Sequence, residues 1–76
     1  MPKQPVVTGA EFAKALRRAG WVEDRQSGSH LILDSPEGLR SVAVPIHSGR
    51  ELAPVLLSKL LKQSGLTGDD LRRLLG

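Results

Sequence analysis

Residues 21–46 read WVEDRQSGSHLILDSPEGLRSVAVPI. Three short segments in this stretch have the pattern of strands, and they are separated by a turn signal at Ser27-Gly28 and by a second one at residues 35–38, SPEG. The strands that we predict are Trp21–Arg25, Ser29–Asp34 and Leu39–Ile46. Because connections this short join neighbouring antiparallel strands, the three strands should form a meander.

Side chains of a strand alternate between the two faces of its sheet, and this period predicts where the core lies. Leu31 and Leu33 share one face of the second strand, and Val42 and Val44 share one face of the third. We expect these four side chains to face the helices. By the same period, His30 should point to the opposite face or to its rim.

Helical signals lie on both sides of the strands. Thr8 with Glu11, and Thr67 with Asp70, have the spacing of a capping box, in which each side chain caps the backbone of the other residue. The predicted helices are Gly9–Ala19, one that begins at Pro54 and ends at Gly65, and a short one after Thr67, with a loop over Ile46–Ala53. This order predicts an α+β fold with the helices on one face of a three-stranded antiparallel sheet.

The chain has 76 residues, of which 39% are hydrophobic, enough for one small core. We expect residues 8–76 to form a single domain and residues 1–7, which hold two prolines, to be a flexible arm. There is no cysteine, so disulfides and thiolate metal sites are excluded. No run approaches the roughly 20 apolar residues of a membrane span, and the N-terminus lacks a signal peptide pattern, so we expect a cytoplasmic protein with no membrane partner.

Charge gives the first indication of a partner. Eleven Lys and Arg against eight Asp and Glu give a formal net charge of +3, which favours polyanions such as RNA. Trp21 and Phe12 are the two aromatic residues, so RNA binding should rest on phosphate, sugar and shape rather than on stacking. The alternative is that the charges are the solvated outer faces of amphipathic helices. The candidate RNA-binding residues on the predicted helices are Lys14, Arg17, Arg18, Lys59 and Lys62.

The chain holds two histidines, the side chains that titrate nearest to neutral pH, so acid–base chemistry points to them first. His30 follows Gly28 and Ser29, where a tight turn permits close approach of a ligand and where hydroxyl and amide groups can contact a phosphate. A histidine placed there can act as general base on a ribose 2′-hydroxyl, which then attacks the adjacent phosphorus. The residues alone leave a second interpretation open, in which His30 is a polar residue at the start of a strand.

Three further residues could assist such a reaction. His47 could protonate the leaving 5′-oxygen, Arg50 could bind a phosphate through two hydrogen bonds, and Arg25 could stabilise charge that develops on phosphate oxygens. Each of them can also be a solvated surface residue. Two histidines without a third or fourth ligand at a supporting spacing do not predict a zinc site, and nucleotide-binding motifs are missing, so we expect no metal and no cofactor.

Four phrases in this chain resemble the HicA family of bacterial and archaeal mRNA interferase toxins. They are AGWV at residues 19–22, RQSGSH at 25–30, VPIHSGREL at 44–52 and LLKQSGLT at 60–67. The resemblance extends over about Thr8 to Leu75, nearly the whole chain, and four phrases in register are much more specific than one motif. The chain departs from the family at Ser27, where many relatives have lysine, and at Arg50, which replaces a frequent lysine.

The resemblance implies a fold like the double-stranded-RNA-binding domain, α-β-β-β-α, here with a short extra C-terminal helix. It also implies the toxin of a type II toxin–antitoxin system, a metal-independent endoribonuclease that cleaves mRNA. In the family the essential histidine is the one in Gly-Ser-His, which is His30 in this sequence. A HicB antitoxin is the implied partner, and it covers the active face. The rival interpretations are a non-catalytic RNA-binding module of the same fold and a protein-interaction domain.

Overall fold

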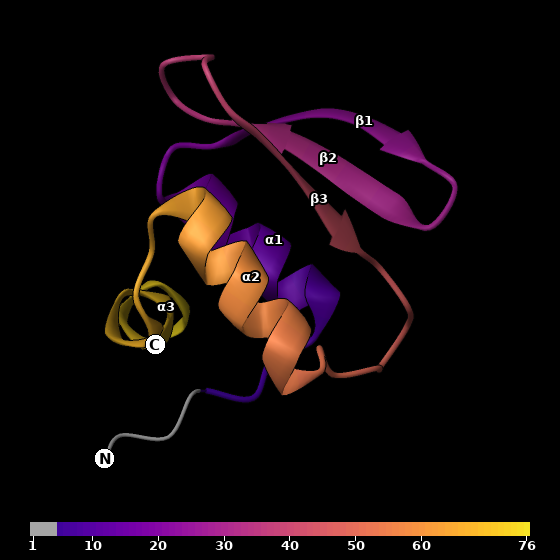
Figure 1. Ribbon diagram of the computed structural model, residues 1–76, viewed down its shortest axis with the longest axis vertical. Helices are drawn as coiled ribbons and strands as arrows, with labels where there is room; N and C mark the ends of the chain where they lie inside the picture. Colours follow the sequence, from indigo (N-terminus) through magenta and orange to yellow (C-terminus); the bar gives the residue numbers. More distant parts are fainter. Residues whose placement is uncertain (1–4) are drawn as a thin grey trace.

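The structure, a computed structural model, describes residues 5–76 and confirms the predicted α+β fold (Figure 1). Its elements are α1 (Gly9–Arg18), β1 (Val22–Ser27), β2 (His30–Asp34), β3 (Ser41–Pro45), α2 (Pro54–Ser64) and α3 (Gly68–Leu75). The strands form one antiparallel sheet in the order β1-β2-β3. The sheet makes one layer and the three helices gather on one side of it, which leaves the other face of the sheet open.

Both predicted capping boxes form. At the start of α1, the Thr8 hydroxyl accepts a hydrogen bond from the backbone N–H of Glu11 at 3.1 Å, and the Glu11 carboxylate accepts one from the backbone N–H of Thr8 at 2.9 Å. Thr67 and Asp70 make the same reciprocal pair at the start of α3, with both distances at 3.0 Å. Each box satisfies backbone donors that a helix start otherwise leaves unpaired, so both helices begin where the sequence predicts.

The second helix, α2, also follows its predicted bounds, but a proline and a glycine set them instead of a capping box. Pro54 occupies its first turn, where the missing N–H removes no hydrogen bond. Gly65 ends the helix in the left-handed conformation, with a φ of 76°, and its N–H donates to the carbonyl of Leu61 at 2.9 Å. No helix within residues 5–76 combines the length and the hydropathy needed to cross a membrane.

The bounds of the first two strands differ from the predicted ones. Strand β1 runs two residues beyond the predicted end at Arg25, and Ser27 pairs with His30 across a two-residue turn. The predicted start of β2 at Ser29 is therefore wrong by one residue, because Gly28, with a φ of 60°, and Ser29 together make the turn. A two-residue hairpin turn needs this left-handed conformation at its first position, which glycine supplies without strain.

The third strand is shorter than predicted, since Leu39 and Arg40 belong to the preceding turn. The hydroxyl of Ser35 accepts hydrogen bonds from the backbone N–H groups of both residues, at 3.2 and 3.0 Å. The Ser35 N–H in turn donates to the carbonyl of Arg40 at 2.8 Å. These bonds close the loop on a buried serine, so strand pairing begins only at Ser41.

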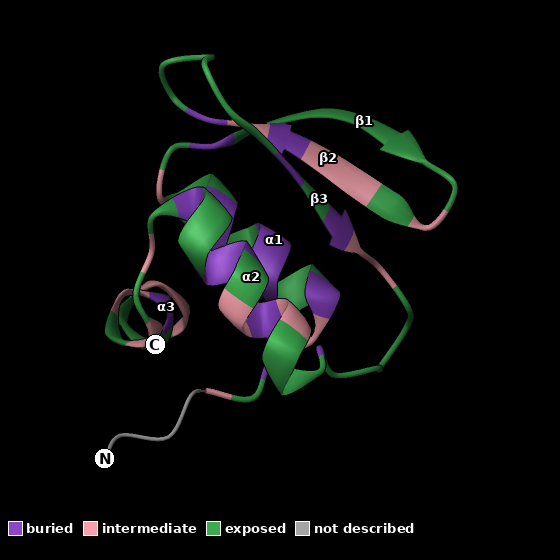
Figure 2. Cartoon of the chain, in the orientation of Figure 1, coloured by how far each residue is buried: buried purple, intermediate pink, exposed green. Residues whose placement is uncertain are grey.

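The core lies between the helices and one face of the sheet (Figure 2). Leu33, Val42 and Val44 are each no more than 1% exposed, as the alternation of the strands predicts. The helices cover them with Phe12 and Leu16, both fully buried. Further buried hydrophobic residues complete the core: Val7, Ala13, Ala15, Trp21, Leu52, Leu57, Leu60, Leu61 and Leu71. In contrast, all of β1 is exposed, so this strand is held mainly by its pairing with β2.

The N-terminal segment joins this core earlier than expected. Val7 is only 4% exposed, and its carbonyl accepts a hydrogen bond from the backbone N–H of Leu52 at 2.8 Å. Val7, which the expected arm includes, is thus held to the core by burial and by a backbone hydrogen bond. The expected arm also includes residues 1–4, which lie outside the described residues.

Candidate active site

His30 is the first residue of β2 and lies in the middle of the sheet at its end. It pairs with Ser27 of β1 on one side and with Pro45 of β3 on the other. The ladder continues one step further, because the backbone N–H of Ile46 donates to the carbonyl of Ser29 at 2.6 Å. Residues 27–30 and Pro45 thus form one end of the sheet, and we call this end, together with the loop residues 46–50, the His30 corner.

The strand register places His30 on the open face. Leu33 and its partner Val42 are buried beneath the helices, so the residues of opposite parity face away from them. A contact between Asp34 and Ser41 supports this assignment, since the Ser41 hydroxyl donates to the Asp34 carboxylate at 2.7 Å on the same open face as His30. His30 is exposed, in agreement with the direction predicted from the alternation.

Arg25 lies on the same face as His30, and a bulge in β1 shapes its surroundings. The register shifts between Glu23, which pairs with Leu33, and Arg25, which pairs with Ile32, so that Asp24 is an extra residue. A bulge lets neighbouring side chains approach each other. The Arg25 guanidinium contacts the Asp24 carboxylate at 2.5 Å, and this ion pair would have to open or be shared when Arg25 binds a phosphate.

His47 and Arg50 lie in the loop that follows β3. The backbone N–H of Arg50 donates to the carbonyl of His47 at 2.9 Å, which closes a tight turn through Gly49. Within residues 5–76, no hydrogen bond or ion pair engages the side chains of His30, His47 or Arg50. His30 thus begins β2, and His47 and Arg50 lie in the loop that follows its neighbour β3, with all three residues exposed.

The basic residues of the helices lie elsewhere. Arg17 forms an ion pair with Glu23 at 2.5 Å, and Arg18 donates to the carbonyl of Leu74 at 2.5 Å. Both are thus engaged in contacts between elements of the fold. The remaining three candidates are exposed and belong to the helix layer, on the opposite side from the open face: Lys14, Lys59 and Lys62. The five residues do not gather around His30.

Two contacts that the sequence analysis missed hold the His30 corner in place. A Cβ added to Gly9 would stand 1.9 Å from the carbonyl oxygen of Pro45, so the bare Cα of Gly9 lies against the strand that pairs with His30. The neighbouring Thr8 forms an isolated antiparallel bridge with Glu51, at the end of the loop that carries His47. A glycine directly after a helix cap was the signal in the sequence, because glycine is not favoured inside a helix.

Carboxyl groups with a shifted pKa lie away from this corner. The Ser35 side chain lowers the pKa of Glu37 by a hydrogen bond, in the turn at the other end of β2. At the start of α3, hydrogen bonds from the Thr67 backbone and then its side chain lower the pKa of Asp70. No group of three or more His, Asp and Glu side chains that could hold a metal ion occurs within the described part of the chain.

Comparison with known proteins identifies the family. A search of the curated proteins found no match to this chain. The family model described as the HicA toxin of bacterial toxin–antitoxin systems matches residues 9–66, from the first residue of α1 to just beyond α2. The match includes the whole sheet and every residue of the His30 corner. Because it covers well over half of the sequence, the chain belongs to the HicA toxin family.

Proposed function

We propose that this toxin is an endoribonuclease that cleaves mRNA, with His30 as its general base. The observation that carries the proposal is the placement of His30, which is exposed on the open face beside the turn of Gly28 and Ser29. Its side chain is free of hydrogen bonds and ion pairs within residues 5–76. An imidazole in this position can approach a ribose from solvent without first losing a protein contact.

The proposed reaction balances without an added reactant. His30 takes the proton of the ribose 2′-hydroxyl, and the resulting oxygen attacks the adjacent phosphorus. The bond from the 2′-oxygen to phosphorus forms while the bond from phosphorus to the 5′-oxygen breaks. His47, in its protonated form, gives a proton to the departing 5′-oxygen. The products are a 2′,3′-cyclic phosphate and a free 5′-hydroxyl.

Neighbouring groups would bind the phosphate during this reaction. Arg50 is exposed in the loop after β3, and its guanidinium could donate two parallel hydrogen bonds to phosphate oxygens. The Ser29 hydroxyl and the backbone of Gly28 flank His30 in the turn. Arg25 lies on the same face, two residues before Ser27, the β1 partner of His30. These residues would stabilise the charge that grows on the phosphate oxygens as the new bond forms.

A HicB antitoxin would neutralise the toxin by covering the His30 corner. Within residues 5–76 no helix covers the open face of the sheet (Figure 1), and His30 and the loop residues 47–50 are exposed. A domain of this size has little room for a separate regulatory site with two distinct states. Steric cover of the site is therefore the simplest means of inhibition that this fold offers.

Incubation of the purified protein with RNA in the presence of a chelator tests the function directly. We expect cleavage that persists in the chelator and leaves a 2′,3′-cyclic phosphate. The substitution His30→Ala should lower the rate by roughly two to four orders of magnitude, the usual effect of a positioned general base. Leu39→Ala, an exposed change in the turn at the other end of β2, is the matched control and should retain full activity.

An oligonucleotide with 2′-deoxy sugars throughout, offered beside its RNA twin, completes the test. The deoxy substrate lacks the attacking hydroxyl and should remain intact. Cleavage of both substrates at the same rate, or loss of RNA cleavage in the chelator, would contradict the histidine mechanism. RNA that is bound but never cleaved by the wild-type protein would instead support a non-catalytic RNA-binding module.

A further inference from the structure

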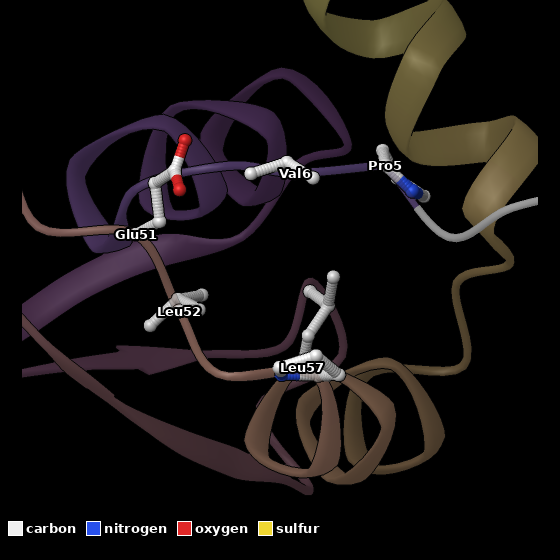
Figure 3. A pocket seen from close by; sticks show the side chains of 6 residues that line it. Pro5, Val6, Glu51, Leu52 and Leu57 are labelled. Carbon is white, nitrogen blue, oxygen red and sulfur yellow. The ribbon is translucent and has the colours of Figure 1, made fainter.

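A small cleft lies beside the His30 corner, between the N-terminal segment and the first turn of α2 (Figure 3). Its volume is about 200 Å³. The residues that line it are Pro5, Val6, Glu51, Leu52, Pro54 and Leu57. Pockets for whole small-molecule ligands begin at about 300 Å³, so this cleft, which we call the Glu51 cleft, fits a single flat ring system instead.

Glu51 is the one charged residue in the lining of the cleft. Within residues 5–76 its carboxylate has no hydrogen bond and no ion pair. Figure 3 shows its side chain rising from the loop toward the segment of Val6, while Leu52 and Leu57 lie on the side of the loop and α2. A ligand that suits this lining has apolar flat faces and N–H donors at one edge, because an ionised carboxylate only accepts hydrogen bonds.

The cleft is connected to the His30 corner by the two contacts that hold that corner. Gly9 lies against Pro45, the β3 partner of His30, and the adjacent Thr8 is bridged to Glu51. Successive Cα atoms are about 3.8 Å apart and paired strands about 5 Å, so this chain of contacts spans about 20 Å or less. A few nucleotides of single-stranded RNA can span this distance along the loop that carries Arg50.

We propose that the Glu51 cleft is a subsite for one unpaired base of the RNA substrate, and that it favours guanine. The Watson–Crick edge of guanine carries two adjacent N–H donors, which match the two oxygens of the Glu51 carboxylate. Uracil places a carbonyl oxygen on each side of its single N–H, and these oxygens would meet the carboxylate with like charge. The apolar residues of the lining would pack against the faces of the ring in place of the aromatic platforms that the sheet lacks.

This inference rests on the proposed RNA cleavage, because it assigns part of the same substrate. Sequencing of the RNA ends produced by the wild-type protein should reveal a preference for guanine over uracil at one position within a few nucleotides of the cut. Glu51→Gln replaces one acceptor by a donor and should reduce this preference by about tenfold, the effect of losing a hydrogen bond to a charged group. Glu37→Gln removes the same charge at the opposite end of β2 and should leave the preference unchanged.

A binding measurement separates this inference from the catalytic proposal. The methyl resonances of Leu52 and Leu57 in the His30→Ala protein should shift on addition of a short single-stranded RNA that contains one guanine, and not with an all-uracil RNA of equal length. Shifts with guanine but no cleavage by the wild-type protein would refute the nuclease and retain the subsite. Cleavage without base preference and without these shifts would refute the subsite alone. Shifts caused only by a protein antitoxin would assign the cleft to that partner and overturn the inference.

Discussion

Gly9 and Pro45, 36 positions apart in the sequence, are in direct contact, and the carbonyl oxygen of Pro45 occupies the space that a side chain on Gly9 would need. The contact presses the first turn of α1 against the end of β3. His30 pairs with Pro45, so the position of the proposed base depends on this close approach.

Gly9→Ala should therefore lower the free energy of unfolding. The added methyl would stand 1.9 Å from backbone atoms that cannot rotate away, and overpacking of this kind costs about 1–3 kcal/mol. Urea denaturation measures the effect. Gly68→Ala is a matched control, because Gly68 is also the first residue after a threonine cap, and a Cβ added there would stand 3.2 Å from the Pro5 ring. Equal stability changes in the two variants would contradict the importance of the Gly9 contact.

The capping box of α3 should contribute stability that depends on pH. Thr67 lowers the pKa of the Asp70 carboxyl in the folded protein, through its backbone and then its side chain, with a smaller effect of Arg73. A lowered folded pKa means that this contribution is present above the ordinary aspartate value and is lost as the pH falls through the folded value.

Asp70→Asn should thus reduce the loss of stability as the pH falls below the ordinary aspartate pKa of 3.8, because the replacement side chain does not titrate. Urea denaturation at a series of pH values gives the comparison. Asp69→Asn changes the neighbouring residue, which lies outside the capping box and contacts Arg72 at 2.6 Å. Identical pH profiles for the wild-type and Asp70→Asn proteins would show that the capping carboxylate does not govern this dependence.

Arg40 joins the turn before β3 to the C-terminal end of α2. Its guanidinium lies 5.7 Å from the centroid of the Trp21 ring and donates to the carbonyl of Gln63 at 3.4 Å. Arg40→Ala should lower the free energy of unfolding by about 1 kcal/mol and alter the fluorescence of Trp21. Lys62→Ala, an exposed change on α2, should alter neither property. A stable Arg40→Ala protein with unchanged fluorescence would argue against this contact in solution.

Phosphate binding should depend on the His30 corner more than on the helices. Arg50→Ala should reduce the slope of log affinity against log salt concentration by about 0.7, the value for one phosphate contact in single-stranded nucleic acid. Lys14 is exposed on the helix layer, and Lys14→Ala should leave both the affinity and the slope nearly unchanged. Binding titrations of a short RNA with the His30→Ala protein over several salt concentrations test both variants. If Lys14→Ala reduced the slope more than Arg50→Ala, the RNA would bind to the helix layer instead.

The antitoxin complex offers a further test. Hydrogen exchange at residues 27–30 and 45–50 should slow when the antitoxin binds, because we expect its surface to cover the His30 corner. The outer face of α1, which carries Lys14, should exchange at an unchanged rate. Protection confined to the helices, with the corner still exchanging freely, would exclude inhibition by steric cover.

The sequence alone determined the features that depend on neighbours within one or two turns of the chain. The capping pairs Thr8 with Glu11 and Thr67 with Asp70 could be predicted because both partners lie three residues apart. The alternation of β2 likewise predicted that His30 faces away from the core. The resemblance to the HicA family, which includes the Gly-Ser-His phrase, predicts His30 as the essential histidine. These properties need only local geometry and the burial of apolar side chains.

Only the tertiary structure decided how the distant parts of the candidate site meet. The bulge at Asp24 reverses the faces of the residues before it, so that Glu23 turns to Arg17 of α1 and Arg25 remains beside the open face. The alternation of β1 in the sequence contains no sign of an inserted residue. The contact of Gly9 with Pro45 likewise depends on packing between segments that the sequence separates widely. Such contacts follow from the shape and volume of the whole core, which no local pattern specifies.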